Sequence, residues 1–182
     1  GRSYYYLGQY DRAIENYKKA IELNPEKNAA VPYYLMGLSY HYLGQYDRAI
    51  ESYKKAIELN PEELNPEYAD TYYNMGFSYA NLGQYDRAIE SLKKAIELNP
   101  EYADAYYIMG LSYHYLGQDD RAIESYKKAI ELNPENADFY YNMGLSYHTK
   151  GDFDKALIYY KKAARLGHKG AQNFLKENGH TW

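Results

Sequence analysis

The chain has 182 residues and a net charge of −4, with 21 Lys and Arg against 25 Asp and Glu. It therefore lacks the basic excess of proteins that bind nucleic acid or lie on membrane surfaces, and neither is expected as a partner. The absence of cysteine excludes disulfides, thiolate metal ligands and thiol nucleophiles, and is compatible with a reducing compartment, so we expect a cytoplasmic protein. Tyrosine occurs 27 times, beside 4 Phe and 1 Trp. Because its side chain joins an apolar ring to a polar hydroxyl, this count indicates much surface that is partly buried in the core and partly exposed to water.

A repeated string of residues organises the whole chain. Leu-Gly-Gln-Tyr-Asp-Arg-Ala-Ile-Glu begins at Leu7, Leu43 and Leu82. It returns at Leu116 with Asp119 in place of tyrosine, and more loosely at Lys150. The string starts at residues 7, 43, 82, 116 and 150, so successive starts are 36, 39, 34 and 34 residues apart. The period is therefore 34 residues, with extra residues in the first two connections. Such a period is typical of a helical repeat array.

The first unit is shorter than the others. Gly1 aligns with Gly37 and with the glycines of the later units, so a short helix over residues 1–7 is expected to lack its opening half. The natural protein is then expected to extend upstream, where a targeting segment could lie. We divide the array into a partial first repeat, four further repeats, and a capping helix with its tail: 1–29, 30–68, 69–102, 103–136, 137–166 and 167–182.

Each full unit is predicted to hold two helices. In the most regular unit these cover 103–116 and 119–132, with Gly117 permitting the turn and Asn133-Pro134 ending the second helix. Glu124 and Lys128 stand four apart and are predicted to support that helix on its solvated face. Residues 63–67 copy residues 58–62, and Pro61 is predicted to end its helix so that the copy forms a longer loop.

The spacing of aromatic and small residues resembles the tetratricopeptide repeat (TPR). The family pattern is W-x2-L-G-x2-Y, then A-x3-F, then P. One unit matches it with Tyr106, Met109, Gly110, Tyr113, Ala122, Tyr126 and Pro134, and the preceding unit with Tyr72, Met75, Gly76, Tyr79, Ala88, Leu92 and Pro100. The resemblance implies an all-α fold: a right-handed α-solenoid of helix-turn-helix repeats with a C-terminal capping helix over 169–178.

The resemblance also implies a concave groove, lined by the first helix of each unit, that binds extended peptides or helices. By position, the residues that face it are Tyr34, Leu38, His41, Tyr73, Asn74, Phe77, Tyr107, Leu111, His114, Tyr141, Asn142, Leu145 and His148. The alternative is that these side chains mainly pack against neighbouring units. Asn74 and Asn142 stand where some relatives bond the backbone of a bound peptide, although Leu35 and Ile108 interrupt that series.

Some relatives hold the acidic C-terminal tails of chaperones in a clamp of lysine, asparagine and arginine. Here tyrosine, leucine and phenylalanine occupy the expected positions, and Asp70, Asp104 and Asp138 stand where another lysine would be. The sequence therefore predicts no acidic-tail clamp. The aspartates favour either a basic ligand or, more simply, the first turn of each helix, whose dipole they complement.

The sequence offers no candidate catalytic or metal site. His41, His114 and His148 occur once per unit without an acidic or histidine partner four residues on, whereas zinc requires three or four close ligands. We therefore predict a non-enzymatic scaffold for protein–protein interaction, without cofactor or metal, that binds a protein or peptide and associates weakly end to end. The alternatives are a self-assembling structural array, an accessory domain of a larger enzyme, or an engineered consensus-like scaffold.

Overall fold

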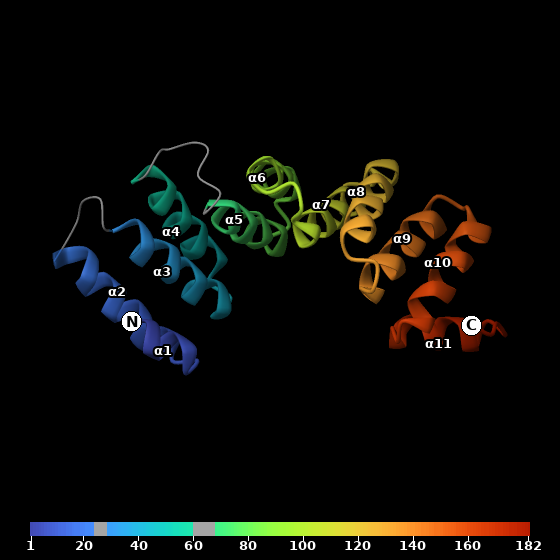
Figure 1. The fold of residues 1–182 in the computed structure, drawn as a ribbon, viewed down its shortest axis with the longest axis horizontal. Helices are drawn as coiled ribbons and strands as arrows, with labels where there is room; N and C mark the ends of the chain where they lie inside the picture. Colours follow the sequence, from blue (N-terminus) through green and yellow to red (C-terminus); the bar gives the residue numbers. More distant parts are fainter. Residues whose placement is uncertain (24–28, 60–67) are drawn as a thin grey trace. The chain divides into compact units, whose positions relative to one another are not determined.

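The computed structural model describes residues 1–23, 29–59 and 68–182. The described residues form helices with no strand among them (Figure 1). In chain order the helices are α1 (Arg2–Tyr6), α2 (Tyr10–Leu23), α3 (Ala30–Tyr42), α4 (Tyr46–Glu58), α5 (Ala69–Asn81), α6 (Tyr85–Leu98), α7 (Ala103–Tyr115), α8 (Asp119–Leu132), α9 (Ala137–Thr149), α10 (Phe153–Arg165) and α11 (Lys169–Glu177). The predicted all-α fold is confirmed.

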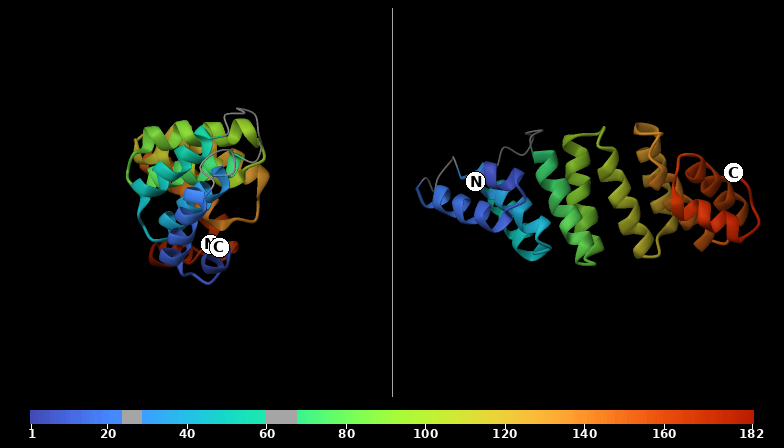
Figure 2. Two further views of the ribbon diagram at one scale, coloured as in Figure 1. Left: turned by 90° about the vertical axis from the view of Figure 1, so that its left-hand side faces the viewer. Right: turned by 90° about the horizontal axis from the view of Figure 1, so that it is seen from below.

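The helices form two compact units. Unit 1 spans Gly1–Asn99 and holds α1 to α6, and unit 2 spans Pro100–Trp182 and holds α7 to α11. Within each unit every helix packs against the next one in the chain, and α3 also contacts α5, as α7 contacts α9. The right-hand view of Figure 2 shows α5 and α6 as two green helices side by side. Each unit is therefore a stack of helical hairpins, as expected for a solenoid.

A glycine in the first helix lets the two helices of a pair approach closely. A Cβ atom added to Gly110 would lie 2.5 Å from Cε1 of Tyr126, so the ring of Tyr126 on α8 passes directly over this glycine on α7. The same arrangement joins Gly144 to Tyr160, at 2.8 Å from Cδ1. The turn between the helices uses a second glycine, Gly117, whose φ of 71° lies in the left-handed region that favours glycine.

Helix limits follow the sequence closely where they can be compared. The predicted helices 103–116 and 119–132 are observed as Ala103–Tyr115 and Asp119–Leu132, and the capping helix 169–178 as Lys169–Glu177. Before the tandem copy, α4 ends at Glu58, and α4 packs against α5, so the stack continues across this connection. Pro61 and the copied segment lie outside the described residues.

The outer charges pair differently from the prediction. The ammonium of Lys128 contacts Glu131 at 2.6 Å, three residues on, rather than Glu124 four residues back. Lys55 likewise contacts Glu58. Both partners in each pair are more than half exposed, so these ion pairs add little to stability. Asp70, Asp104 and Asp138 lie in the first turns of α5, α7 and α9, as predicted.

Candidate binding faces

The predicted groove residues lie on the first helices of four pairs and form one face in each unit. The α3/α5 face comprises Tyr34, Leu38, His41, Tyr73, Asn74 and Phe77, and the α7/α9 face comprises Tyr107, Leu111, His114, Tyr141, Asn142, Leu145 and His148. All of these side chains are half-buried. They therefore both pack within their unit and present surface to solvent, so the packing and binding interpretations are compatible.

Contacts between neighbouring repeats hold the α3/α5 face together. Nδ1 of His41 lies 2.8 Å from the hydroxyl of Ser78, and the ring of His41 lies 5.0 Å from that of Phe77. Ser78 donates its own proton to the carbonyl of Asn74 at 2.8 Å, so it accepts from His41, whose proton is then on Nδ1. Burial lowers the pKa of His41, because desolvation disfavours the charged ring. The neutral Nδ1–H form of His41 is therefore favoured.

On the α7/α9 face, Tyr107 and Asn142 tie α7 to α9. The amide of Asn142 donates to the Tyr107 hydroxyl at 3.0 Å and to the carbonyl of Asp138 at 2.9 Å. The ring of Tyr107 lies 4.9 Å from that of Phe139. Asn74 makes the equivalent backbone contact, to the carbonyl of Asp70 at 2.7 Å. Both asparagines are thus engaged within the chain.

The capping segment covers part of the last repeat. The ring of His168 stacks on Tyr141 with centroids 4.1 Å apart, and Phe174 of α11 lies 5.9 Å from the ring of His148. Tyr141 also packs in a tilted arrangement against Tyr160, with ring centroids 5.6 Å apart. Tyr107 and Tyr141 are therefore both half-buried, Tyr107 against Phe139 and Tyr141 against the capping segment.

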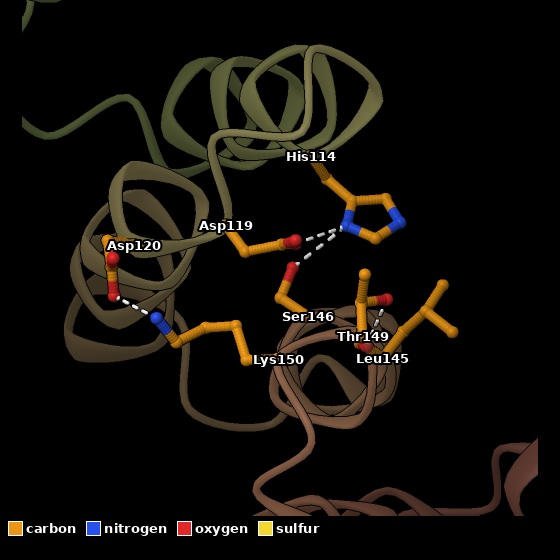
Figure 3. A network of polar contacts seen from close by, with 7 residues as sticks. All are labelled: His114, Asp119, Asp120, Leu145, Ser146, Thr149 and Lys150. Atoms are coloured by element: carbon orange, nitrogen blue, oxygen red, sulfur yellow. Dashed lines mark hydrogen bonds and ion pairs between the residues drawn. The ribbon is translucent and has the colours of Figure 1, made fainter.

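A polar cluster that the sequence analysis missed lies around His114 (Figure 3). Its Nδ1 lies 2.6 Å from Oδ1 of Asp119, at the start of α8, and 3.1 Å from the hydroxyl of Ser146 on α9. Side-chain exposure is 17% for His114 and 9% for Asp119. Because a carboxylate only accepts hydrogen bonds, Nδ1 carries the proton, and Nε2 points away from both partners in Figure 3. The available signal was the replacement of tyrosine by Asp119, five residues after the histidine.

The His114 cluster does not have the geometry of a nucleophile–base–acid triad. In such a triad the acid contacts one ring nitrogen and the nucleophile the other. Here Asp119 and Ser146 approach the same nitrogen, so His114 is not placed to take a proton from Ser146. In the part of the chain that the structure describes, no group of three or more His, Asp or Glu side chains could hold a metal ion.

A pocket in unit 1 lies away from the α3/α5 face. It has a volume of about 560 Å³ between α2, α3 and α4, and is lined largely by charged and aromatic side chains, among them Lys18, Tyr33, Tyr40, Arg48 and Lys54. None of the predicted groove residues lines it. A partner that bound the second helices would find its surface here.

Family models match the chain along most of its length. A model described as tetratricopeptide repeat matches residues 1–62 and 27–101, and others with the same description match 91–124 and 137–168. A model described as TPR repeat matches 110–151. The chain belongs to the tetratricopeptide repeat family. No curated protein sequence matches it.

Solved TPR structures share the fold. A crystal structure of MamA is 36% identical, with a TM-score of 0.83 over 93% of this chain and 95% of that one. MamA from Desulfovibrio magneticus RS-1 is 26% identical, with a TM-score of 0.82 over 91% of this chain and 89% of that one. YrrB, described as a TPR protein with an unusual peptide-binding site, is 29% identical, with a TM-score of 0.81 over 96% of this chain and 88% of that one.

The family and these neighbours support a scaffold for protein–protein interaction. Among the described helices, none has the length and apolar character needed to cross a membrane.

Proposed function

We propose that the chain binds a peptide or helical segment of a partner protein on the aromatic faces of its first helices, and that it does not clamp acidic tails. The observation that carries this proposal is the set of half-buried tyrosine, leucine, phenylalanine and histidine side chains on the α3/α5 and α7/α9 faces. Rings held in place by neighbouring repeats bind with little loss of conformational entropy, which favours aromatic anchors at interfaces.

The neighbours and the charges support the same proposal. The description of YrrB names a peptide-binding site, and this chain shares its fold over 96% of its length. Helices α7 and α9 contain Asp104 and Asp138 but no lysine or arginine, so an acidic tail would meet like charge there. Binding by a scaffold requires no cofactor, and we assign none.

Site-specific photo-crosslinking tests which surface binds. A photoreactive amino acid is placed at Leu111 on the α7/α9 face or at Leu38 on the α3/α5 face, and at Glu51 or Glu124 on exposed second-helix surface as controls. After exposure to a lysate of the source cells, each face position should capture a partner segment that the control positions do not capture. Capture only from Glu51 and Glu124 would place the partner on the second helices and contradict the proposal.

Weak end-to-end association between copies is a second proposal. Tyr6 and Leu7 at the end of α1 are 82% and 70% exposed, so they offer apolar surface to another molecule. Light scattering over a range of concentrations should show a rising mean mass. A Tyr6→Ser, Leu7→Ser double variant should remain monomeric, and equal behaviour of the two proteins would contradict this assignment.

A further inference from the structure

Asp119 occupies a position that is aromatic in every other repeat. The equivalent residues are Tyr10, Tyr46, Tyr85 and Phe153. The ring of Tyr46 packs edge-on against His41 at 5.2 Å, and that of Phe153 packs edge-on against His148 at 5.1 Å. In the fourth repeat the ring is absent, and His114 meets a carboxylate instead. One repeat of the array therefore presents an acidic group where the others present an apolar one.

The Asp119 carboxylate retains capacity to accept hydrogen bonds. Its Oδ1 is engaged by His114, and the described residues provide no further partner for the side chain. As the first residue of α8, its negative charge is favoured by the helix dipole. About a tenth of the side chain remains open to solvent. An ionised carboxylate can accept several hydrogen bonds, and a buried one gains most from a cationic donor.

A buried hydroxyl also lies on α8, the helix that Asp119 begins. The hydroxyl of Tyr126 is fully buried and has no hydrogen-bond partner among the described residues. Burial raises the pKa of Tyr126, and the nearby phenol of Tyr107 and carboxylate of Asp119 raise it further. Among the described residues, the hydroxyls of Tyr17 and Tyr53 are buried without a partner in the same way, in repeats with tyrosine at the position of Asp119, so this hydroxyl is a feature of the repeat and does not itself mark a ligand site.

The surroundings of Asp119 favour a cation. Neither α7 nor α9, which carry His114 and Ser146, contains lysine or arginine. Two basic side chains nearby are engaged elsewhere: Arg121, two residues on, donates to Gln118 at 3.0 Å, and the ammonium of Lys150 is bound to Asp120 at 2.6 Å (Figure 3). The ring of Tyr115, 65% exposed, lies 5.9 Å from that of His114 and offers an aromatic face of the kind that binds cations.

We propose that the His114–Asp119 pair is a specificity subsite on the α7/α9 face that receives a lysine or arginine side chain of the bound peptide. This inference rests on the proposed function, because the subsite adds selectivity to a peptide already held by the aromatic face. The cationic group donates a hydrogen bond to the Asp119 carboxylate and lies against the ring of Tyr115. The α3/α5 face has no equivalent, since Tyr46 and Tyr85 fill that position there, so its ligands are free of this requirement.

Selection from a display library of random peptides tests the subsite. The library is selected on the wild-type chain, on Asp119→Asn, and on Asp119→Tyr, which restores the residue of three other repeats. Asp120→Asn is the matched control, because it removes the same charge at the next residue. The side chain of Asp120 is 84% exposed. Circular dichroism checks that each variant is folded. The wild-type chain and Asp120→Asn should select peptides with lysine or arginine at one fixed position, and both Asp119 variants should lose that preference.

The selected peptide then gives a quantitative test. Replacing its basic residue with methionine should weaken binding to the wild-type chain about tenfold and leave binding to Asp119→Asn unchanged, as expected for a close charge pair. A consensus without a basic residue, or a basic preference that survives in both Asp119 variants, would overturn the subsite while leaving the binding function intact. Failure to select any peptide that competes with crosslinking at Leu111 would instead contradict the proposed function itself.

Discussion

The ring of Tyr53 on α4 lies over Gly37 on α3, so closely that a Cβ atom at Gly37 would be 2.5 Å from Cε1 of the ring. The ring is fully buried and cannot move aside without disturbing both helices. Gly37→Ala should therefore destabilise unit 1 by roughly 1–3 kcal/mol through overpacking. The measurement is chemical denaturation followed by circular dichroism.

Gly44→Ala is the control for that substitution. Gly44 has nothing within 4 Å of an added Cβ atom, but its φ of 70° is unfavourable for alanine. Its cost should be about 1–2 kcal/mol and should come from the backbone alone. A Gly37→Ala variant as stable as the wild type would show that the helices can separate at no cost, and would contradict the close approach.

Removal of the Tyr53 hydroxyl should not destabilise the protein. The hydroxyl is buried without a partner among the described residues, and the third repeat has Leu92 at the same position. Tyr53→Phe is expected to be neutral or to stabilise by up to about 1 kcal/mol, because it removes a desolvated polar group. Thermal and chemical unfolding measure the change. A loss of more than about 1 kcal/mol would reveal a bound water or another partner for the hydroxyl.

His41 should make stability depend on pH. Burial lowers its pKa below the ordinary value of 6.5, so the unfolded chain binds a proton more readily than the folded one. The contribution of His41 to stability is therefore complete above about pH 6.5 and is lost as the pH falls from there toward the folded pKa. His41→Gln should flatten this part of the stability profile relative to the wild type. Parallel profiles for the two proteins would contradict the shift.

The His114–Asp119 pair should be energetically coupled. In a double-mutant cycle with His114→Gln and Asp119→Asn, the coupling should be about 1–3 kcal/mol, since the pair is largely buried and charge-assisted. The corresponding cycle of His41→Gln with Tyr46→Leu joins two rings and should give about 0.5–1.5 kcal/mol. Equal couplings would indicate that Asp119 acts only by packing.

The helical hairpins were predictable because a 34-residue period repeats the same small set of contacts. Gly110 and Ala122 are small where helices approach, and the proline and glycine positions fix the turns, so local rules and tertiary packing agree. The polar cluster was not predictable from a search for an acidic or histidine partner four residues after each histidine on the same helix. Asp119 follows a turn and begins the next helix, and Ser146 comes from the next repeat, so only the folded chain brings them to His114.

The capping helix itself was predicted, but its contacts with the last repeat were not. Helix α11 begins after His168, a residue that is rarely recognised as an N-cap, and its Nδ1 accepts the amide of Ala171 at 3.0 Å. Its position over Tyr141 depends on the turn that precedes it, and the sequence pattern of the repeats does not extend there. The degree to which Tyr141 remains accessible therefore could not be inferred from its place in the repeat.

The last prediction separates the two roles of His168, which caps α11 and stacks on Tyr141. His168→Ala removes both contacts, together with that of its Nε2 to Asp138 at 3.5 Å, and should destabilise α11 by roughly 1–3 kcal/mol, mainly the sum of a lost cap and a lost ring pair. His168→Asn keeps an acceptor for the cap but loses the ring, and should cost about 0.5–1.5 kcal/mol. Hydrogen exchange at the amide of Ala171 and its neighbours reports the opening of α11 separately from the rest of unit 2. If the asparagine variant exchanges as slowly as the wild type, the ring of His168 contributes nothing to the docking of α11, and Tyr141 is available to a ligand at no cost. If it exchanges as fast as the alanine variant, the stack rather than the cap holds α11, and a ligand that binds Tyr141 must compete with it.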